Sequence, residues 1–590
     1  MVRSLLFATL IAGSVVSASL AIVSKSTAQE PAPPVNLSAQ VDGELASVWR
    51  RDQIKPAPRS SDAEFLRRVY LDTTGATPSR EEAAAFSSDP DTNRREKLID
   101  ALTSDPRFGR YMADIWTSII VGRGAGQLNA SDLFAVWMAR RINEGAGFDA
   151  IIREVLTASG NLADTPAIAV YFKEGEARDL RDVAGKLTRV FSGVQIQCAQ
   201  CHKHPYEKWT QADFSGMTSY FIGVQARVNN DLRPGLATAV DSGENLKRIN
   251  DAVKKRSTLN KEQLEKLETL LPFTKPKTLN GVTPASSDPT TWRKDLAKWF
   301  TAAGNTQTPR YVVNRLFAIA FGRGLHEPVD DFNSLTSPSH PQLLEALTAD
   351  FVANGWDLRR LYRALLKSDA WQLSSSGRDA KAQPSHFAAY PVRPLGPESF
   401  IASLVAFGDA AELGSAVKVA RNKVFDDLRA EAARFEKNKE EGKLPANERR
   451  YVYDLESVAK YEKWVAEMPD AWLLRRTAAA RYARLATDDE MAESESFTLS
   501  IDQALAVMNG AFTNKISMMG GDSLLARIFK ETNDPAGRIK ALYLGVLCRE
   551  PSEAELSRAL DWVKAPARAP KIYEDLMFAL LMTTEFATNH

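Results

Sequence analysis

The sequence predicts a mainly α-helical fold, with two helical domains, a charged helical excursion in the second and little β structure. Apolar residues recur every three or four positions over long stretches, as on the buried face of a helix. Three such sets are Phe65, Leu66, Val69 and Tyr70; Leu343, Leu344, Leu347 and Phe351; and Leu358, Leu361, Leu365 and Leu366. Strict alternation, typical of a half-buried strand, is scarce, and residues 221–228 are the best strand candidate.

The expected helix starts agree with this fold class. Thr77-Pro78, Asp105-Pro106 and Thr308-Pro309 each place a side-chain oxygen directly before a proline. Such an oxygen accepts a hydrogen bond from a backbone N–H of the first turn, and the N–H that proline lacks would have had no partner there. Ser552 and Glu555 have the spacing of a capping box, in which each side chain bonds to the other residue's backbone N–H.

Composition indicates an ordinary globular protein. The 590 residues are 44% hydrophobic and 25% charged, and 75 basic residues balance 74 acidic ones to a net charge of +1. At about 100–200 residues per domain, this length allows two or more domains. The balanced charge gives no support for a nucleic-acid partner. Three cysteines are too few for a disulfide-rich scaffold.

The N-terminus has the features of a secretory signal peptide. Met1-Val2-Arg3 is a short basic start, residues 5–23 are apolar, and Ser26-Thr27-Ala28 supplies small residues at the usual cleavage positions. We expect residues 1–28 to be removed and the protein to be exported to the periplasm or the cell surface. The alternative is an uncleaved anchor helix, because the apolar stretch is about long enough to span a bilayer. No comparable stretch follows, so no stable transmembrane segment is expected after cleavage.

Charge runs and turn-rich stretches divide the mature chain. Residues 247–266 and 421–450 are strongly charged, as in solvated connecting or projecting segments. The expected order is a linker leading into the first domain at 29–60, a helical domain at 61–228, a charged connector at 229–289, and a second helical domain at 290–590 with a charged excursion at about 415–490.

The chemically most informative segment is Cys198-Ala199-Gln200-Cys201-His202. Two cysteines three residues apart with a histidine after the second form the attachment pattern of c-type haem. Each thiol can add to one vinyl group of a haem, and the adjacent imidazole can bind the iron as an axial ligand. The motif therefore predicts haem c, with thioethers at Cys198 and Cys201 and His202 as the axial ligand. Six histidines and three cysteines exclude a multihaem cytochrome.

The same residues fit two other kinds of site. Cys198, Cys201, His202 and His204 could together bind Zn or Fe without haem. The two cysteines could also close a structural disulfide in an exported protein. Cys548 follows an apolar run and is expected to be a buried thiol of the core.

The sixth ligand of a bound haem is less defined. Met217, fifteen residues after His202, is the nearest thioether, and a Met/His pair would raise the reduction potential. His204 is only two residues from His202, too close to reach the opposite face of the same iron. It is expected to lie around the ligands or to serve in the non-haem set.

A second polar cluster is expected from residues that lie between apolar segments: Asn314, Arg315, Arg323, His326, Asp330, Asp331 and His340. Carboxylates with histidines and arginines can bind a metal or act in acid–base chemistry. The structural alternative is that the arginines pair with the aspartates to fix a loop, while His340 caps the helix after it. The sequence has no nucleophile elbow, P-loop, H-E-x-x-H or dinucleotide fingerprint, so catalytic residues are not identified.

Longer motifs resemble a known pair of domains. In the first half they are residues 65–75 (FLRRVYLDTTG), 197–206 (QCAQCHKHPY) and 209–214 (WTQADF); in the second half they are 313–317 (VNRLF), 321–325 (FGRGL), 328–332 (PVDDF), 339–341 (SHP), 505–510 (LAVMNG) and 580–586 (LLMTTEF). They resemble the planctomycete-type cytochrome-like domain of unknown function followed by its planctomycete-specific partner domain, also of unknown function. The resemblance implies export and a helical fold. The charged excursion at 420–450 departs from the common pattern.

The functional expectation is an exported, c-type-cytochrome-like protein with a role in electron transfer or haem-assisted redox chemistry. Its partner would be a redox protein or an envelope component. Two alternatives stay open: a non-haem Zn or Fe protein with hydrolytic activity, and an envelope or glycan-binding scaffold with a C-x-x-C disulfide.

Overall fold

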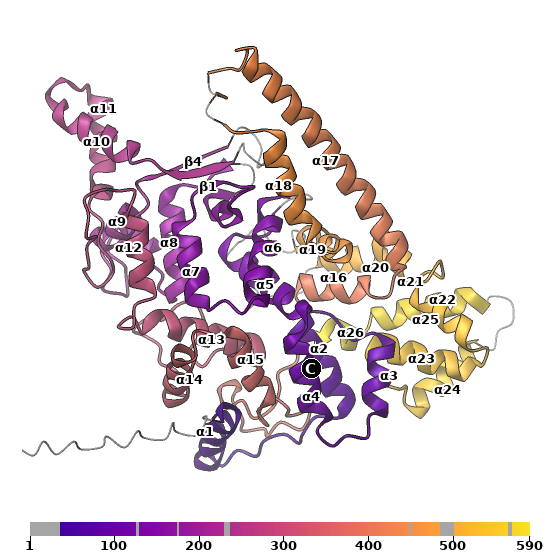
Figure 1. Cartoon of the computed structure of the whole chain (residues 1–590). Coiled ribbons are helices and arrows are strands. Elements are labelled where there is room, and N and C mark those ends of the chain that lie inside the picture. The colour runs from indigo at the N-terminus through magenta and orange to yellow at the C-terminus, as the bar shows by residue number, and fades with distance from the viewer. Residues whose placement is uncertain are drawn as a thin grey trace, which may run out of the picture. The chain divides into compact units, whose positions relative to one another are not determined.

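The mainly α-helical fold class is confirmed, since helices follow one another along the chain and the strands are few and short (Figure 1). The computed structural model describes residues 36–124, 129–173, 176–228, 237–446, 448–449, 451–483, 501–563 and 569–590. The expected signal peptide at 1–28 lies outside these residues, as do parts of the expected connector and excursion. Residues 37–590 form one unit.

The first part of the chain is mostly helical, with four short strands in its second half. Its elements are α1 (Leu37–Asp52), α2 (Asp62–Thr74), α3 (Arg80–Ser88), α4 (Arg94–Ser104), α5 (Pro106–Ile120), α6 (Ala130–Asn143), α7 (Phe148–Thr157), β1 (Gly160–Asn161), the 3-10 turn η1 (Pro166–Tyr171), β2 (Phe172–Lys173), β3 (Glu176–Ala177), α8 (Leu180–Ser192), η2 (Gln197–Gln200), α9 (Gln211–Ser219) and β4 (Val224–Arg227).

The segment expected as a connector contributes a strand and two helices. Its elements are β5 (Thr238–Asp241), α10 (Glu244–Lys254), η3 (Arg256–Thr258), α11 (Lys261–Leu270) and η4 (Leu271–Thr274). Strand β5 lies between β1 and β4 in an antiparallel sheet, with Ala239 opposite Gly160 on one side and Ala226 on the other. The strand expected at 221–228 is thus confirmed at its centre, and the connector is joined to the first domain by this sheet.

The remainder of the chain is again helical. Its elements are α12 (Trp292–Phe300), α13 (Gln307–Phe321), α14 (Pro341–Ala353), α15 (Leu358–Lys367), η5 (Pro384–His386), β6 (Arg393–Pro394), α16 (Pro397–Val405), α17 (Ala410–Glu440), α18 (Leu455–Ala466), α19 (Asp470–Ala483), α20 (Ile501–Asn509), α21 (Ala511–Ser517), α22 (Leu524–Glu531), α23 (Pro535–Leu547), α24 (Glu553–Val563), α25 (Ala569–Leu581), α26 (Thr584–Ala587) and β7 (Thr588–Asn589). No helix in the described part is both long and apolar enough to cross a bilayer.

Two of the expected helix starts are confirmed and two are displaced. Asp105 accepts from the Arg107 N–H at the start of α5, and the predicted capping box precedes α24 with both bonds present. In contrast, α3 begins after Ser79, two residues beyond Thr77. Helix α13 begins at Gln307, because the Asn305 side chain already accepts from the first backbone N–H groups.

The stretch expected as a linker at 29–60 contains helix α1. Leu37, Val41 and Leu45 are spaced by four residues, lie on one face of that helix and are buried. A helix with such a stripe packs against a core, so the first domain begins earlier along the chain than its composition suggested.

The charged excursion is a pair of helices with an apolar seam. Figure 1 shows α17 as a long helix that runs beside α18. Phe425 lies 5.6 Å from Tyr461 between ring centroids, and Phe435 lies 5.9 Å from Tyr453. The charges cover the outside of this pair, which explains why the sequence is so polar although the segment is helical.

A buried carboxylate joins the first helices to the end of the chain. Asp72 of α2 is only 1% exposed. Its oxygens accept hydrogen bonds from the Tyr390 hydroxyl (2.8 Å), Arg393 Nη2 (2.7 Å) and Asn589 Nδ2 (2.7 Å). We call these four residues the Asp72 cluster. Its members other than Asp72 lie more than 300 residues further along the chain.

Two arginines of the same helix add to this connection. Arg68 Nη1 donates to the carbonyl oxygens of Trp371 (2.7 Å) and Leu373 (2.8 Å), and Arg67 Nη2 donates to that of Phe586 (2.7 Å). Figure 1 accordingly shows α2 next to α26. The FLRRVYLD motif is thus a structural motif: its charged residues face inward and fix distant segments.

Removal of the Asp72 carboxylate should strongly destabilise the fold. Asp72→Ala leaves the Arg393 guanidinium and two neutral donors without their acceptor, at a cost of about 3–5 kcal/mol in the free energy of unfolding. Urea unfolding followed by circular dichroism measures this loss. Asp427→Ala, at an exposed position of α17, is the matched control and should stay within about 0.5 kcal/mol of the parent. Equal effects of the two substitutions would contradict the role of the cluster.

Candidate functional site

The C-x-x-C-H motif lies on a tight turn between two helices. Helix α8 ends at Gly193, whose φ of +63° is readily adopted only by glycine, and whose N–H donates to the Arg189 carbonyl. A 3-10 turn then carries Cys198, and Ala199 N–H donates to the Ile196 carbonyl at 2.9 Å. Ala199 is fully buried, so this one residue anchors the turn in the core.

Both thiols of the motif are exposed to solvent. Cys198 and Cys201 are free cysteines in the structure, not a disulfide, whereas Cys548 is free and buried as expected. Thiols on a surface turn can be reached by a reactant that approaches from outside. The position therefore suits a covalent modification.

The hydrogen bond of His202 favours the tautomer that leaves Nε2 available as a ligand atom. Its Nδ1 lies 2.8 Å from the backbone carbonyl oxygen of Lys203. Because a carbonyl can only accept, Nδ1 must carry the proton, and the lone pair of the neutral ring is on Nε2. The ring is exposed, so Nε2 is accessible as a ligand atom beside the two thiols.

His204 has the opposite tautomer. Its Nδ1 accepts backbone N–H bonds from Tyr206 (3.3 Å) and Glu207 (3.0 Å), so the proton of the neutral ring is on Nε2. That arrangement orders the loop and does not offer Nε2 to a metal. Among the residues that the structure describes, no three His, Cys, Asp or Glu side chains are grouped as a metal site. The four residues of the non-haem set are therefore not brought together as such a group.

Met217, the expected sixth ligand, lies inside the core. Its side chain in α9 has no exposed surface, whereas His202 is exposed. Bonding to an iron held by His202 would require this methionine to leave the core. The sixth ligand stays a prediction.

The second polar cluster is partly assembled. Asp330 pairs with Arg189 at 3.2 Å and with Arg315 at 3.9 Å. Asn314 Nδ2 donates to the His326 carbonyl and His326 N–H donates to Asn314 Oδ1, both at 2.9 Å. These contacts fix the loop that follows α13.

The other members of that cluster have separate partners. Arg323 pairs with Glu327 at 3.9 Å, and Asp331 accepts from Asn333 Nδ2 at 2.9 Å. His340 occupies the N-cap position of α14, but its Nδ1 lies 3.0 Å from the Ser339 hydroxyl and makes no cap bond. The residues of the cluster therefore act in loop structure and do not converge on a common centre.

A contact that no sequence spacing indicates joins the motif to this loop. Glu207 Oε1 accepts from the Ser334 N–H and the Ser334 hydroxyl, each at 2.6 Å. These donors lower the pKa of the Glu207 carboxyl. On the other side of the motif, Phe332 N–H donates to the Gly193 carbonyl at 2.7 Å. The two segments are more than 100 residues apart, so only the fold reveals the contact.

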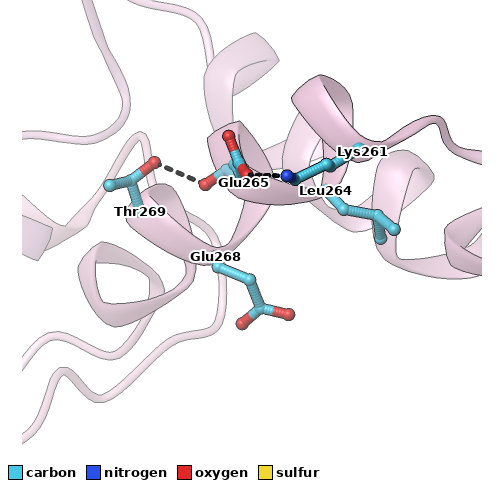
Figure 2. Close-up of a pocket in the computed structure, with 5 residues that line it drawn as sticks. All are labelled: Lys261, Leu264, Glu265, Glu268 and Thr269. Atoms are coloured by element: carbon cyan, nitrogen blue, oxygen red, sulfur yellow. Dashed lines mark hydrogen bonds and ion pairs between the residues drawn. The ribbon is translucent and has the colours of Figure 1, made fainter.

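A surface hollow elsewhere in the chain does not form a site. It lies on α11 and is lined by Lys261, Leu264, Glu265, Glu268 and Thr269 (Figure 2). All five residues belong to one helix. Lys261 Nζ lies 3.9 Å from Glu265 Oε1, and both side chains are exposed. The hollow is thus the outer face of that helix, and it has no converging polar groups.

Two family models match the chain, one after the other along the sequence. Residues 40–226 match the family PSCyt2, described as a protein of unknown function (DUF1549). Residues 292–563 match the family PSD1, described as a protein of unknown function (DUF1553). The chain therefore belongs to the planctomycete-type proteins in which these two domains follow one another, as the resemblance predicted. The motif lies in the first domain and its contact loop in the second.

One curated protein shows a local similarity. Over 146 residues the chain is 25% identical to "Maintenance of telomere capping protein 5" of Saccharomyces cerevisiae. That stretch is 24% of this chain and covers 12% of the length of the yeast protein. No solved structure matches the chain.

The three thiols should differ sharply in reactivity. In native protein prepared without haem attachment, a thiol reagent should modify Cys198 and Cys201 rapidly, since both are exposed. Cys548 should react only after unfolding, because burial shields it and raises its pKa. Counting modified thiols against time, with and without denaturant, checks this. Three equally fast thiols would contradict the structure.

Stability should depend on pH through His340. Burial lowers the pKa of this ring to about 4, and its Nε2 has no hydrogen-bond partner. In the unfolded chain the pKa of this ring is about 6.5, so below that pH the unfolded state binds a proton that the folded state does not. The free energy of unfolding should therefore fall by about 2–3 kcal/mol between pH 6.5 and pH 4. Above pH 6.5 this contribution should be constant.

The variant His340→Asn should lose that part of the pH dependence, which urea unfolding at several pH values measures. His202→Asn, at an exposed ring, should keep the slope of the parent. An unchanged slope in His340→Asn would show that other groups cause the acid sensitivity.

Proposed function

We propose that the chain is a c-type-cytochrome-like protein that holds one haem covalently at Cys198 and Cys201, with His202 as an axial ligand, and acts in electron transfer or haem-assisted redox chemistry. The single observation that carries this is the state of the motif: two free, exposed thiols beside an imidazole with an accessible Nε2 lone pair. The donor set fits the chemistry of haem c.

The covalent step needs only the residues of the turn and a vinyl-bearing haem. Each Sγ–H adds across a vinyl group, so that one S–C bond forms and the C=C π bond becomes a single bond. The thiol hydrogen goes to the other vinyl carbon, and no oxidant or reductant is consumed. Both thiols are on the surface, so the addition requires no opening of the core.

The other residues of this segment hold the axial ligand and its loop in position. When bound, haem supplies a one-electron iron couple whose potential depends on axial ligands, nearby charge and solvent exposure. The Lys203 carbonyl holds the Nδ1 proton of His202 and thereby keeps the ring in its ligating orientation. The His204 ring accepts two N–H groups and stiffens the loop directly after the axial residue.

Export belongs to the same proposal. Covalent haem attachment in bacteria takes place outside the cytoplasm, and residues 1–28 have the pattern of a signal peptide. A redox protein or an envelope component in the periplasm or at the cell surface is the partner that this location offers.

The test is a pyridine haemochrome spectrum with intact mass, on protein exported from a host that attaches haem. The parent should carry one haem per chain with the spectrum of a two-thioether haem. Cys198→Ala and Cys201→Ala should each keep one thioether, and the double variant should lose covalent haem. Cys548→Ala is the control and should keep the parent spectrum.

Absence of haem from the parent in both measurements would overturn the proposal. Elemental analysis of the same sample would then decide between the alternatives. Zn or Fe in a one-to-one ratio would favour the non-haem metal site. A mass about two units below that of the reduced chain, without metal, would favour the structural disulfide.

A further inference from the structure

One loop of the second domain contacts the C-x-x-C-H segment on both sides. Gly193 lies five residues before Cys198, and its carbonyl accepts from Phe332 N–H at 2.7 Å. Glu207 lies five residues after His202, and its Oε1 accepts twice from Ser334 at 2.6 Å. The two donors are only two residues apart. We call residues 330–335 the bridging loop.

Side-chain packing strengthens the first of these contacts. A Cβ atom at Gly193 would come within 2.7 Å of the Phe332 ring and 2.8 Å of the Tyr311 ring. Arg189, one turn earlier in α8, pairs with Asp330 at 3.2 Å. The end of α8 is therefore in close contact with the second domain over several residues.

The bridging loop is itself well ordered by hydrogen bonds. Asn333 Oδ1 accepts from Leu335 N–H at 2.9 Å and from the Thr336 hydroxyl at 3.1 Å. Asn333 Nδ2 donates to Asp331 Oδ2 at 2.9 Å. A loop with such internal bonds can hold another segment in place at little further entropic cost.

Two exposed apolar side chains adjoin the Glu207–Ser334 contact. Tyr206 is 73% exposed and Leu335 is 71% exposed, the highest values for large apolar side chains among the residues whose exposure is described. Tyr206 directly precedes Glu207, and Leu335 directly follows Ser334. Both side chains are therefore available at this contact to pack against an apolar ligand.

We propose that the bridging loop of the second domain completes the haem site: its bonds to Gly193 and Glu207 position the Cys198–His202 turn from both sides, and Tyr206 with Leu335 covers an apolar face of the attached haem. This inference rests on the proposed haem attachment for its occupant. The occupant is argued from the two exposed thiols on the intervening turn and from the apolar character of a porphyrin. Glu207 is accordingly a positioning residue.

The positioning part is tested without haem, by hydrogen exchange of the full chain. Glu207→Ala removes the acceptor, so amides of residues 196–209 should exchange about tenfold faster. Glu207→Gln keeps an acceptor oxygen and should restore most of the protection. Glu262→Ala, an exposed carboxylate of α11, is the matched control and should leave this peptide unchanged. Unchanged exchange in Glu207→Ala overturns the positioning role.

The same variants then test the site in the host that attaches haem. Glu207→Ala should lower the haem-to-protein ratio several-fold, with rescue by Glu207→Gln. Leu335→Ser should leave attachment intact, but it should shift the midpoint potential of the iron because water gains access to the haem. Val392→Ser, at an exposed valine elsewhere, is the control and should shift nothing.

The outcomes separate this inference from the function on which it rests. Faster exchange in Glu207→Ala with no haem in the parent supports the positioning role and overturns haem as the occupant. Haem in the parent with equal ratios and potentials in all variants supports the proposed function and overturns the bridging loop as part of the site. Should Glu207→Ala fail to fold, Ser334→Ala, which removes one of the two donors, provides the same comparison.

Discussion

The buried Asp72 carboxylate is the constraint on which the arrangement of this chain depends. A carboxylate with almost no exposed surface is stable only if charged and polar partners replace its water. Tyr390, Arg393 and Asn589 provide them, and each must be in place for the others to be satisfied. Helix α2 therefore cannot reach its native environment until segments from the far end of the chain have packed beside it.

The same principle recurs at two further contacts between distant parts of the chain. Asp114 of α5 is buried and accepts from Trp472 Nε1 at 3.0 Å and from Arg476 Nη1 at 2.7 Å, both on α19. Arg293 of α12 donates to Asp241 of β5 and to the Tyr171 hydroxyl. Each buried charge has its partner in a distant segment. This explains physically why two family segments form one unit, since separating them would expose half of every such pair.

The candidate site also depends on contacts between the two family segments. The C-x-x-C-H turn lies at the surface, and only Ala199 anchors it from within. The two histidines of the segment have different tasks because their Nδ1 atoms have different partners: a carbonyl acceptor for His202 and two N–H donors for His204. The bond of His202 leaves its Nε2 accessible as a ligand atom, and the bonds of His204 order the loop. The bridging loop then connects the turn to the second domain through Glu207, whose carboxylate stays ionised beside its Ser334 donors.

The sequence by itself determined the helical class, the family, the candidate ligands and two of the four expected helix starts, because apolar periodicity, capping and motif spacing are local properties. It also indicated a strand within residues 221–228 and a buried Cys548 for the same reason. Local patterns could not show that α1 packs, that Met217 is buried, or that Arg189 is a partner of Asp330. Nor could they show that Glu207 meets Ser334. Those facts depend on which segments meet in space. Pairings between residues more than 100 positions apart are decided in the folded chain, by the pairing of buried charges and by complementary packing.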